Sequence, residues 1–116
     1  MRDHTKLRAF ELADSLALAI YRSTKSFPRE ELFGLSSQMR RAAVSVASNI
    51  VEGCARYSEA EYIRFLEIAF GSAREVEYQM TLAYRLEYLN DSDYKVLINL
   101  SIETSKVLSA LLKSFR

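Results

Sequence analysis

Histidine and cysteine, the side chains that most often supply general bases, nucleophiles and metal ligands, occur once each, as His4 and Cys54. A serine or cysteine nucleophile needs a base beside it, and a di-metal helical bundle needs Glu-x-x-His pairs on facing helices. One histidine near the N-terminus and one cysteine supply neither arrangement. We therefore expect no catalytic residue, no cofactor and no metal site, and we interpret Cys54 as a small residue packed between helices.

Glutamates are the remaining residues that could carry acid–base chemistry. A carboxylate pair of the glycosidase type must flank a single pocket. The candidates here lie in long helical segments and alternate with arginines, a pattern typical of a solvated, ion-paired helix face; they are Glu52, Glu61, Glu67 and Glu75. We therefore predict that the chain is not an enzyme and has no small-molecule substrate.

The segment 38–53 begins an unusual polar stripe. Its members follow one another at steps of three and four residues, so they share one face of a helix: Arg41, Ser45, Ser48, Asn49, Glu52 and Arg56. Serine and asparagine are only moderate helix formers, so helix propensity does not account for their presence.

Two interpretations of the polar stripe compete. In the structural one, its side chains form a polar network between helices or subunits that fixes register and partner choice, and Arg41 and Glu52 are satisfied by each other, by another helix or by another subunit. In the functional one, Arg40, Arg41 and Arg56 contact the phosphates of a nucleic acid. We favour the structural interpretation.

Apolar side chains recur at helical spacing in four segments, which we place at about 7–25, 35–56, 58–89 and 93–114. Ser58 and Glu61 match a capping box at the start of the third segment. Asn90 offers an N-cap before the fourth. Because the connections after the second and third segments are short, neighbouring helices should be antiparallel. The sequence therefore predicts an all-α, antiparallel up-down-up-down four-helix bundle.

The composition agrees with such a bundle. The 116 residues are 49% hydrophobic and 27% charged, and only three glycines and one proline occur among them, which disfavours a turn-rich β fold. No apolar run approaches the roughly 20 residues of a membrane span, and charges interrupt the N-terminal segment where a signal peptide would be apolar. We expect a single domain over residues 1–116, located in the cytoplasm. The net charge of +1 provides no chain-wide nucleic-acid signature.

The third helical segment is apolar on more than one face. Beside its main seam it carries Ile63, Phe70 and Tyr84, whereas a helix in a lone bundle needs one apolar stripe. A second apolar stripe can be buried only against a partner, and the commonest partner is another copy of the chain. We therefore predict a homo-oligomer. Aromatic residues such as Tyr57 could instead stack on exposed bases, but at helical spacing they are more typical of cores and interfaces.

The order of motifs resembles a known family. Phe33-Gly34-Leu35 is followed by Gln38-Met39-Arg40-Arg41-Ala42-Ala43, then by Ser48-Asn49-Ile50 and Glu52-Gly53. This arrangement resembles the four-helix bundle proteins of the 23S rRNA intervening-sequence type, also called the S23 ribosomal protein family, over nearly the whole chain. Two positions depart from the family pattern: Phe10 stands where tryptophan is frequent, and Ala47 where proline is frequent.

The resemblance implies an up-down bundle that assembles as a ring-shaped pentamer. The resemblance does not assign a biochemical role, but it suggests an association with RNA. The alternative that it suggests is a nucleic-acid-binding accessory protein akin to those of diversity-generating retroelements, which are strongly basic barrels. The net charge of +1 sets this chain apart from them. We therefore expect a non-enzymatic helical module whose partner is itself, with RNA as a second candidate partner and no membrane.

Overall fold

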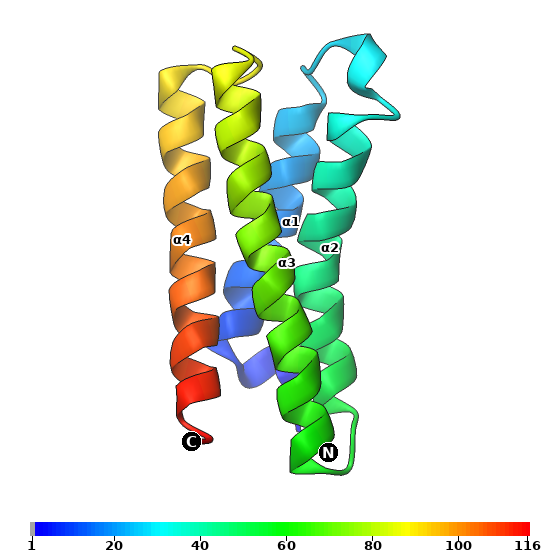
Figure 1. The fold of residues 1–116 in the computed structure, drawn as a ribbon, viewed down its shortest axis with the longest axis vertical. Helices are drawn as coiled ribbons and strands as arrows, with labels where there is room; N and C mark the ends of the chain where they lie inside the picture. Colours follow the sequence, from blue (N-terminus) through cyan, green and yellow to red (C-terminus); the bar gives the residue numbers. More distant parts are fainter. Residues whose placement is uncertain (1) are drawn as a thin grey trace.

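The structure, a computed structural model, describes residues 2–116. In chain order the helices are η1 (His4–Lys6), α1 (Arg8–Thr24), η2 (Arg29–Glu31), α2 (Leu35–Cys54), α3 (Glu59–Arg85) and α4 (Asp91–Lys113), where η marks a 3-10 helix. Consecutive α-helices run in opposite directions, and both chain ends lie at the same end of the molecule (Figure 1). The predicted all-α up-down-up-down four-helix bundle is confirmed.

The four α-helices form a square. Both α1 and α3 pack against α2 and α4, and the most extensive contact joins α2 to α3. Each helix turns one apolar face inward, and the centre is made mainly of aliphatic side chains, among them Leu16, Ile20, Met39, Val46, Ile50, Leu66, Val76, Met80 and Leu108. Cys54 is buried in this core, as expected from its small size.

Helix ends differ from the predicted bounds by a few residues, because local hydrogen bonds decide them. The α3 helix ends at Arg85 rather than at residue 88 or 89, since Glu87 adopts a positive φ of 65°. The amide of Tyr88 then donates to the Ala83 carbonyl and that of Glu87 to the Tyr84 carbonyl, both at 2.9 Å. These bonds form the Schellman motif that closes many helices.

The helix starts follow the predicted caps. The Ser58 hydroxyl accepts from the Glu61 amide at 3.1 Å, but the Glu61 carboxylate pairs with Arg64 at 3.0 Å and not with the Ser58 amide, so within residues 2–116 only one half of the predicted capping box forms. The Asn90 side chain accepts from the Asp93 amide at 2.7 Å, so α4 begins at Asp91 and not at residue 93. The α2 helix ends at Cys54, two residues before the predicted end.

The second apolar stripe of α3 has a partner within the chain, which corrects the reason for expecting an oligomer. Tyr84 stacks on Tyr94 of α4 with ring centroids 4.2 Å apart, and its hydroxyl donates to Asp91 at 2.5 Å. Phe70 packs against the core and shares a groove with Leu112 of α4. Periodicity shows that this face is apolar but not that α4 covers it. Any surface for self-association must therefore be sought elsewhere.

The α2 and α3 helices lie in close contact at Gly53. A Cβ atom at this position would stand 2.9 Å from the Phe65 Cβ and 3.4 Å from the Tyr62 ring. Tyr62 and Phe65 are 2% and 6% exposed. The absence of a side chain at Gly53 therefore lets the first turns of α3 rest directly on the last turn of α2.

The connection from α1 to α2 is anchored by Glu31. One of its carboxylate oxygens accepts from the Leu35 amide at the start of α2, at 3.0 Å. The other accepts from the Tyr88 hydroxyl at 2.8 Å. These hydrogen bonds, the backbone one first, hold the pKa of Glu31 below its ordinary value of 4.5. Gly34, the residue before α2, leaves room for this carboxylate, since a Cβ there would lie 2.6 Å from its oxygen.

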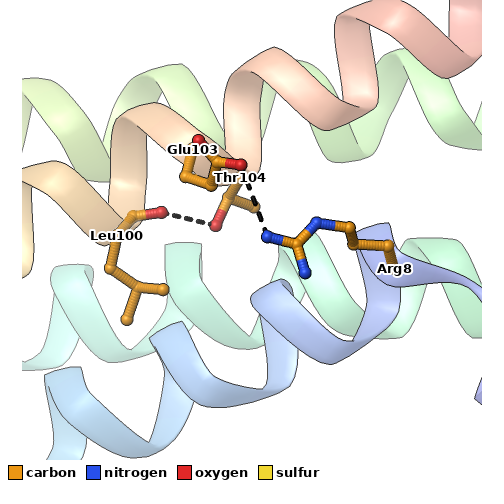
Figure 2. Close-up of polar contacts among 4 residues, drawn as sticks. All are labelled: Arg8, Leu100, Glu103 and Thr104. Carbon is orange, nitrogen blue, oxygen red and sulfur yellow. Dashed lines mark hydrogen bonds and ion pairs between the residues drawn. The ribbon is translucent and has the colours of Figure 1, made fainter.

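The α1 and α4 helices are joined at their surface by one ion pair. Arg8 and Glu103 lie 3.4 Å apart, and both side chains are about half exposed or more (Figure 2). In the next position along α4, the Thr104 hydroxyl donates to the Leu100 carbonyl at 2.7 Å and so satisfies a buried polar group within its own helix. Because exposed ion pairs contribute little, apolar packing must hold these two helices together.

Two glycine-to-alanine substitutions should have opposite effects on stability. Gly71 lies in the middle of α3, exposed, with open space around it, so Gly71→Ala should stabilise the protein by roughly 0.5–1 kcal/mol through helix propensity. Gly53→Ala should destabilise it by roughly 1–2 kcal/mol, because the new methyl group must displace Phe65. Urea unfolding measures both. Equal effects of the two substitutions would show that close packing at Gly53 is not required.

Because of Glu31, the stability of the folded protein should fall as the pH is lowered into the acid range. Since its pKa is lowered in the folded state, its contribution is complete above about pH 4.5 and is lost as the pH falls through the folded value. Glu31→Gln should lower Tm at pH 7, and the difference from the wild type should narrow below pH 4.5. Glu30→Gln, at the neighbouring exposed residue, is the control. A difference in Tm that stays constant from pH 7 to pH 3 would contradict this role.

Candidate functional site

The polar stripe of α2 divides into a buried edge and an exposed edge. At the buried edge, the hydroxyls of Ser45 and Ser72 lie 2.8 Å apart across the α2–α3 contact. Asn49 donates from Nδ2 to the Ser45 carbonyl at 2.8 Å and to its hydroxyl at 3.0 Å. All three residues are half-buried. The structure thus places a small interhelical polar network here, and Ser72 is a member that the sequence did not indicate.

At the exposed edge, Arg41, Ser48 and Glu52 face away from the core. Of the ion pairs found in residues 2–116, none joins Arg41 to Glu52, and neither side chain takes part in another. The two residues are eleven positions apart, about three helical turns, so mutual pairing within one helix is out of reach. Arg41 lines a hollow with Ser72 and Glu75 of α3, so contact with another helix and contact with another subunit both stay open for it.

Arg40 is committed to the fold. Its Nε donates to the Thr24 hydroxyl at 2.8 Å, and its guanidinium lies 5.0 Å from the centre of the Tyr21 ring. Thr24 in turn donates to the Ile20 carbonyl at 2.7 Å. Arg40 therefore ties α2 to α1 through its Nε. Arg56 lies at the other end of α2, exposed, with its guanidinium 4.7 Å from the Phe65 ring centre.

A groove runs along the outer face between α1 and α2. It encloses about 600 Å³ and is lined by Tyr21, Leu32, Phe33, Ser37, Arg40, Arg41, Val44, Ser45 and Ser48. We call it the α1–α2 groove. Its apolar members are unusually exposed: Phe33 is 93% accessible to solvent, and Leu32, Tyr21 and Val44 are between 42% and 48% accessible. Sequence reasoning missed this surface, although Leu32 and Phe33 lie in a connection and Val44 lies off the apolar stripe of its helix.

Two buried titratable groups of residues 2–116, Cys54 and Tyr62, have raised pKa values. Burial raises the pKa of the Cys54 thiol, which favours the unreactive protonated form. Burial likewise raises the pKa of Tyr62. Within residues 2–116 no group of three or more histidine, cysteine, aspartate or glutamate side chains is placed to hold a metal ion. In the same part of the chain, the helices are too short or too polar to cross a membrane.

Comparison with known proteins decides the family. A sequence model described as the 23S rRNA-intervening sequence protein matches residues 5–110. The chain belongs to this family. The resemblance inferred from the motifs is thus confirmed over nearly all of the sequence.

A solved structure supports the family assignment. It is the crystal structure of a protein of unknown function from the S23 ribosomal protein family of Bacteroides thetaiotaomicron. The two chains are 30% identical, their superposition has a TM-score of 0.81, and the match covers 90% of this chain and 98% of that one. No curated protein matches the sequence. Membership of the 23S rRNA-intervening sequence family therefore establishes the fold and the ancestry, and the function has to be argued from the surface.

The serine pair across the α2–α3 contact should be measurable in a double-mutant cycle. Ser45→Ala and Ser72→Ala should each lower the free energy of unfolding by roughly 0.5–1.5 kcal/mol, because each breaks the hydrogen bond between the two half-buried hydroxyls. The double variant should lose less than the sum of the two, by roughly 0.5–1 kcal/mol. Ser48→Ala, on the exposed edge, should have almost no effect. Strictly additive losses would show that the two hydroxyls do not interact.

Proposed function

We propose that this protein is a non-enzymatic helical module that assembles with copies of itself in the cytoplasm. The observation that carries the proposal is the α1–α2 groove, where four large apolar side chains face solvent around one hollow. Single exposed apolar residues are common on protein surfaces, but a contiguous group of them usually marks an interaction site. The nearly complete exposure of Phe33 is the strongest sign that a partner covers it.

A second copy is the occupant that the chain itself provides. The family resemblance favours a ring of five, and a ring needs a heterologous contact in which two different surfaces meet. The outer face of α3 offers the second surface. Ile68 and Tyr78 are 40% and 59% exposed, and the exposed Glu75 lies between them on the same helical face. Gly71, also on this face, leaves it flat.

Both surfaces also carry charge, although Arg41 and Glu75 of one chain line a common hollow between α2 and α3. Arg41 lines the α1–α2 groove and forms no ion pair within residues 2–116. Glu75 lies at the centre of the α3 face, in a segment, residues 58–90, that carries six acidic and three basic side chains. We propose that Ile68 and Tyr78 of one copy enter the groove of the next, with Glu75 beside the neighbour's Arg41.

Charge reversal of the apolar contacts should abolish assembly. By light scattering after size-exclusion chromatography, the wild type at high micromolar concentration should show a multiple of the single-chain mass, near fivefold. Val44→Asp in the groove and Ile68→Asp on α3 should each give monomers, because each places a charge in an apolar contact. Val96→Asp, at a 68% exposed residue of α4, is the matched control and should assemble like the wild type.

Mixing the two variants tests the heterologous geometry. The Ile68→Asp chain keeps an intact groove, and the Val44→Asp chain keeps an intact α3 face, so the mixture should form dimers that cannot grow further. A monomeric wild type would overturn self-assembly. Assembly that Val44→Asp and Ile68→Asp both leave intact would overturn the assigned surfaces. A mixture that stays monomeric would rule out the heterologous contact.

The alternative function is that of a nucleic-acid-binding accessory protein. Of the three arginines expected to contact phosphates, Arg40 is held by Thr24 and Tyr21, and Arg41 is assigned above to the contact between copies. Arg56 supports the alternative, since it lies exposed on an aromatic ring near two further arginines.

A further inference from the structure

The end of the bundle where α2 turns into α3 carries three arginines that rest on aromatic rings. The Arg2 guanidinium lies 3.9 Å from the centre of the Tyr62 ring. Those of Arg56 and Arg64 each lie 4.7 Å from the centre of the Phe65 ring. All three arginines are exposed, whereas both rings are buried. We call this surface the arginine end; the N-terminus lies beside it (Figure 1).

The backbone fixes the arginine end in place. Tyr62 and Phe65 are pressed against α2 at Gly53, so their outer edges form a rigid floor. The Arg2 amide donates to the Cys54 carbonyl at 3.0 Å, which holds the N-terminal segment over the end of α2. Because stacking on a fixed ring restricts a guanidinium before any ligand arrives, less entropy is lost on binding.

Each stacked guanidinium keeps donors for an anion. Stacking uses the face of the group, while its N–H donors point outward around the edge. Arg64 gives its Nε to Glu61 at 3.0 Å, which leaves its two terminal nitrogens. Arg2 and Arg56 take part in none of the ion pairs found in residues 2–116. Three guanidinium edges close together on one surface suit the oxygens of successive phosphates.

Tyr57 is the remaining member of the arginine end. It lies between Arg56 and the cap of α3, and it is 95% exposed. Its ring takes part in none of the aromatic contacts found in residues 2–116. A tyrosine that is 95% exposed gains little stability through burial, but beside a row of arginines its ring provides a platform on which an unpaired base can stack.

We propose that the arginine end binds single-stranded nucleic acid. Arg2, Arg56 and Arg64 donate to backbone phosphates, and Tyr57 stacks on a base. A single strand is the favoured form, because stacking on a protein ring requires a base that is not paired within a duplex. The proposal deepens the nucleic-acid alternative above, relocates it away from Arg40 and Arg41, and does not depend on self-assembly.

The test is fluorescence anisotropy with the full chain and labelled oligo(U) or oligo(dT). With three phosphate contacts, the logarithm of affinity should fall with the logarithm of salt with a slope of about −2. Between 50 and 200 mM salt the affinity should therefore drop roughly tenfold to twentyfold. Binding of either oligomer supports the proposal, and a preference for oligo(U) over oligo(dU), which differ only in the 2′-hydroxyl, would identify contacts to the ribose hydroxyl.

Matched variants separate charge from stacking. Arg56→Ala with Arg64→Ala should reduce the salt slope by about 1.4, whereas Tyr57→Ala should weaken binding by about tenfold with the slope unchanged. Tyr57→Phe should restore the affinity, since it keeps the ring. Arg22→Ala with Arg85→Ala, which removes two exposed arginines near the opposite end of the bundle, should change little.

Four results would overturn the proposal: no binding at 50 mM salt, an equal loss in the two double-arginine variants, no effect of Tyr57→Ala, or tighter binding of duplex RNA than of the single strands. The mass of the arginine-end variants by light scattering should equal that of the wild type. If the wild type is monomeric but still binds oligo(U) in a way that depends on Tyr57, the proposed self-assembly is refuted and the proposed nucleic-acid binding is not.

Discussion

The close approach of α2 and α3 at Gly53 is the constraint on which the other features of the molecule depend. Because this residue has no side chain, Tyr62 and Phe65 can pack against the last turn of α2 and become buried. About two turns along each helix from this contact, Ser45 meets Ser72. The same contact makes the floor on which the arginines of the adjoining end rest.

The core of this bundle is buried within the chain, so apolar side chains that stay exposed indicate where another molecule could bind. The second apolar stripe of α3 is covered by α4 at Phe70 and Tyr84. A second copy of the chain is therefore not needed to bury it. The α1–α2 groove, the outer face of α3 and the exposed Tyr57 remain, together with separate exposed side chains such as Leu18 and Val96. The first two lie along the sides of the bundle and the third lies at its end. Lateral assembly would therefore leave the arginine end accessible to a ligand.

The sequence predicted those features that local physics decides. Apolar periodicity located four helices, and the side chains of Ser58 and Asn90 indicated where two of them begin. Features that depend on which helices become neighbours were not predictable. Arg40 binds Thr24 only because α1 and α2 are adjacent, and Tyr84 is covered because α4 folds back along α3. The exposure of Phe33 and the stacking of Arg2 likewise follow from tertiary packing, which spacing along one chain cannot reveal.

Hydrogen–deuterium exchange at low and at high protein concentration tests the central claim most directly, because one experiment reports on the α2–α3 contact, the sides of the bundle and its end. The account predicts strong protection around Ser45 and Ser72 at both concentrations. It predicts added protection at high concentration in residues 29–44 and along the outer face of α3, with no change at residues 55–58. An exchange pattern that does not change with concentration, or added protection confined to α4, would contradict it.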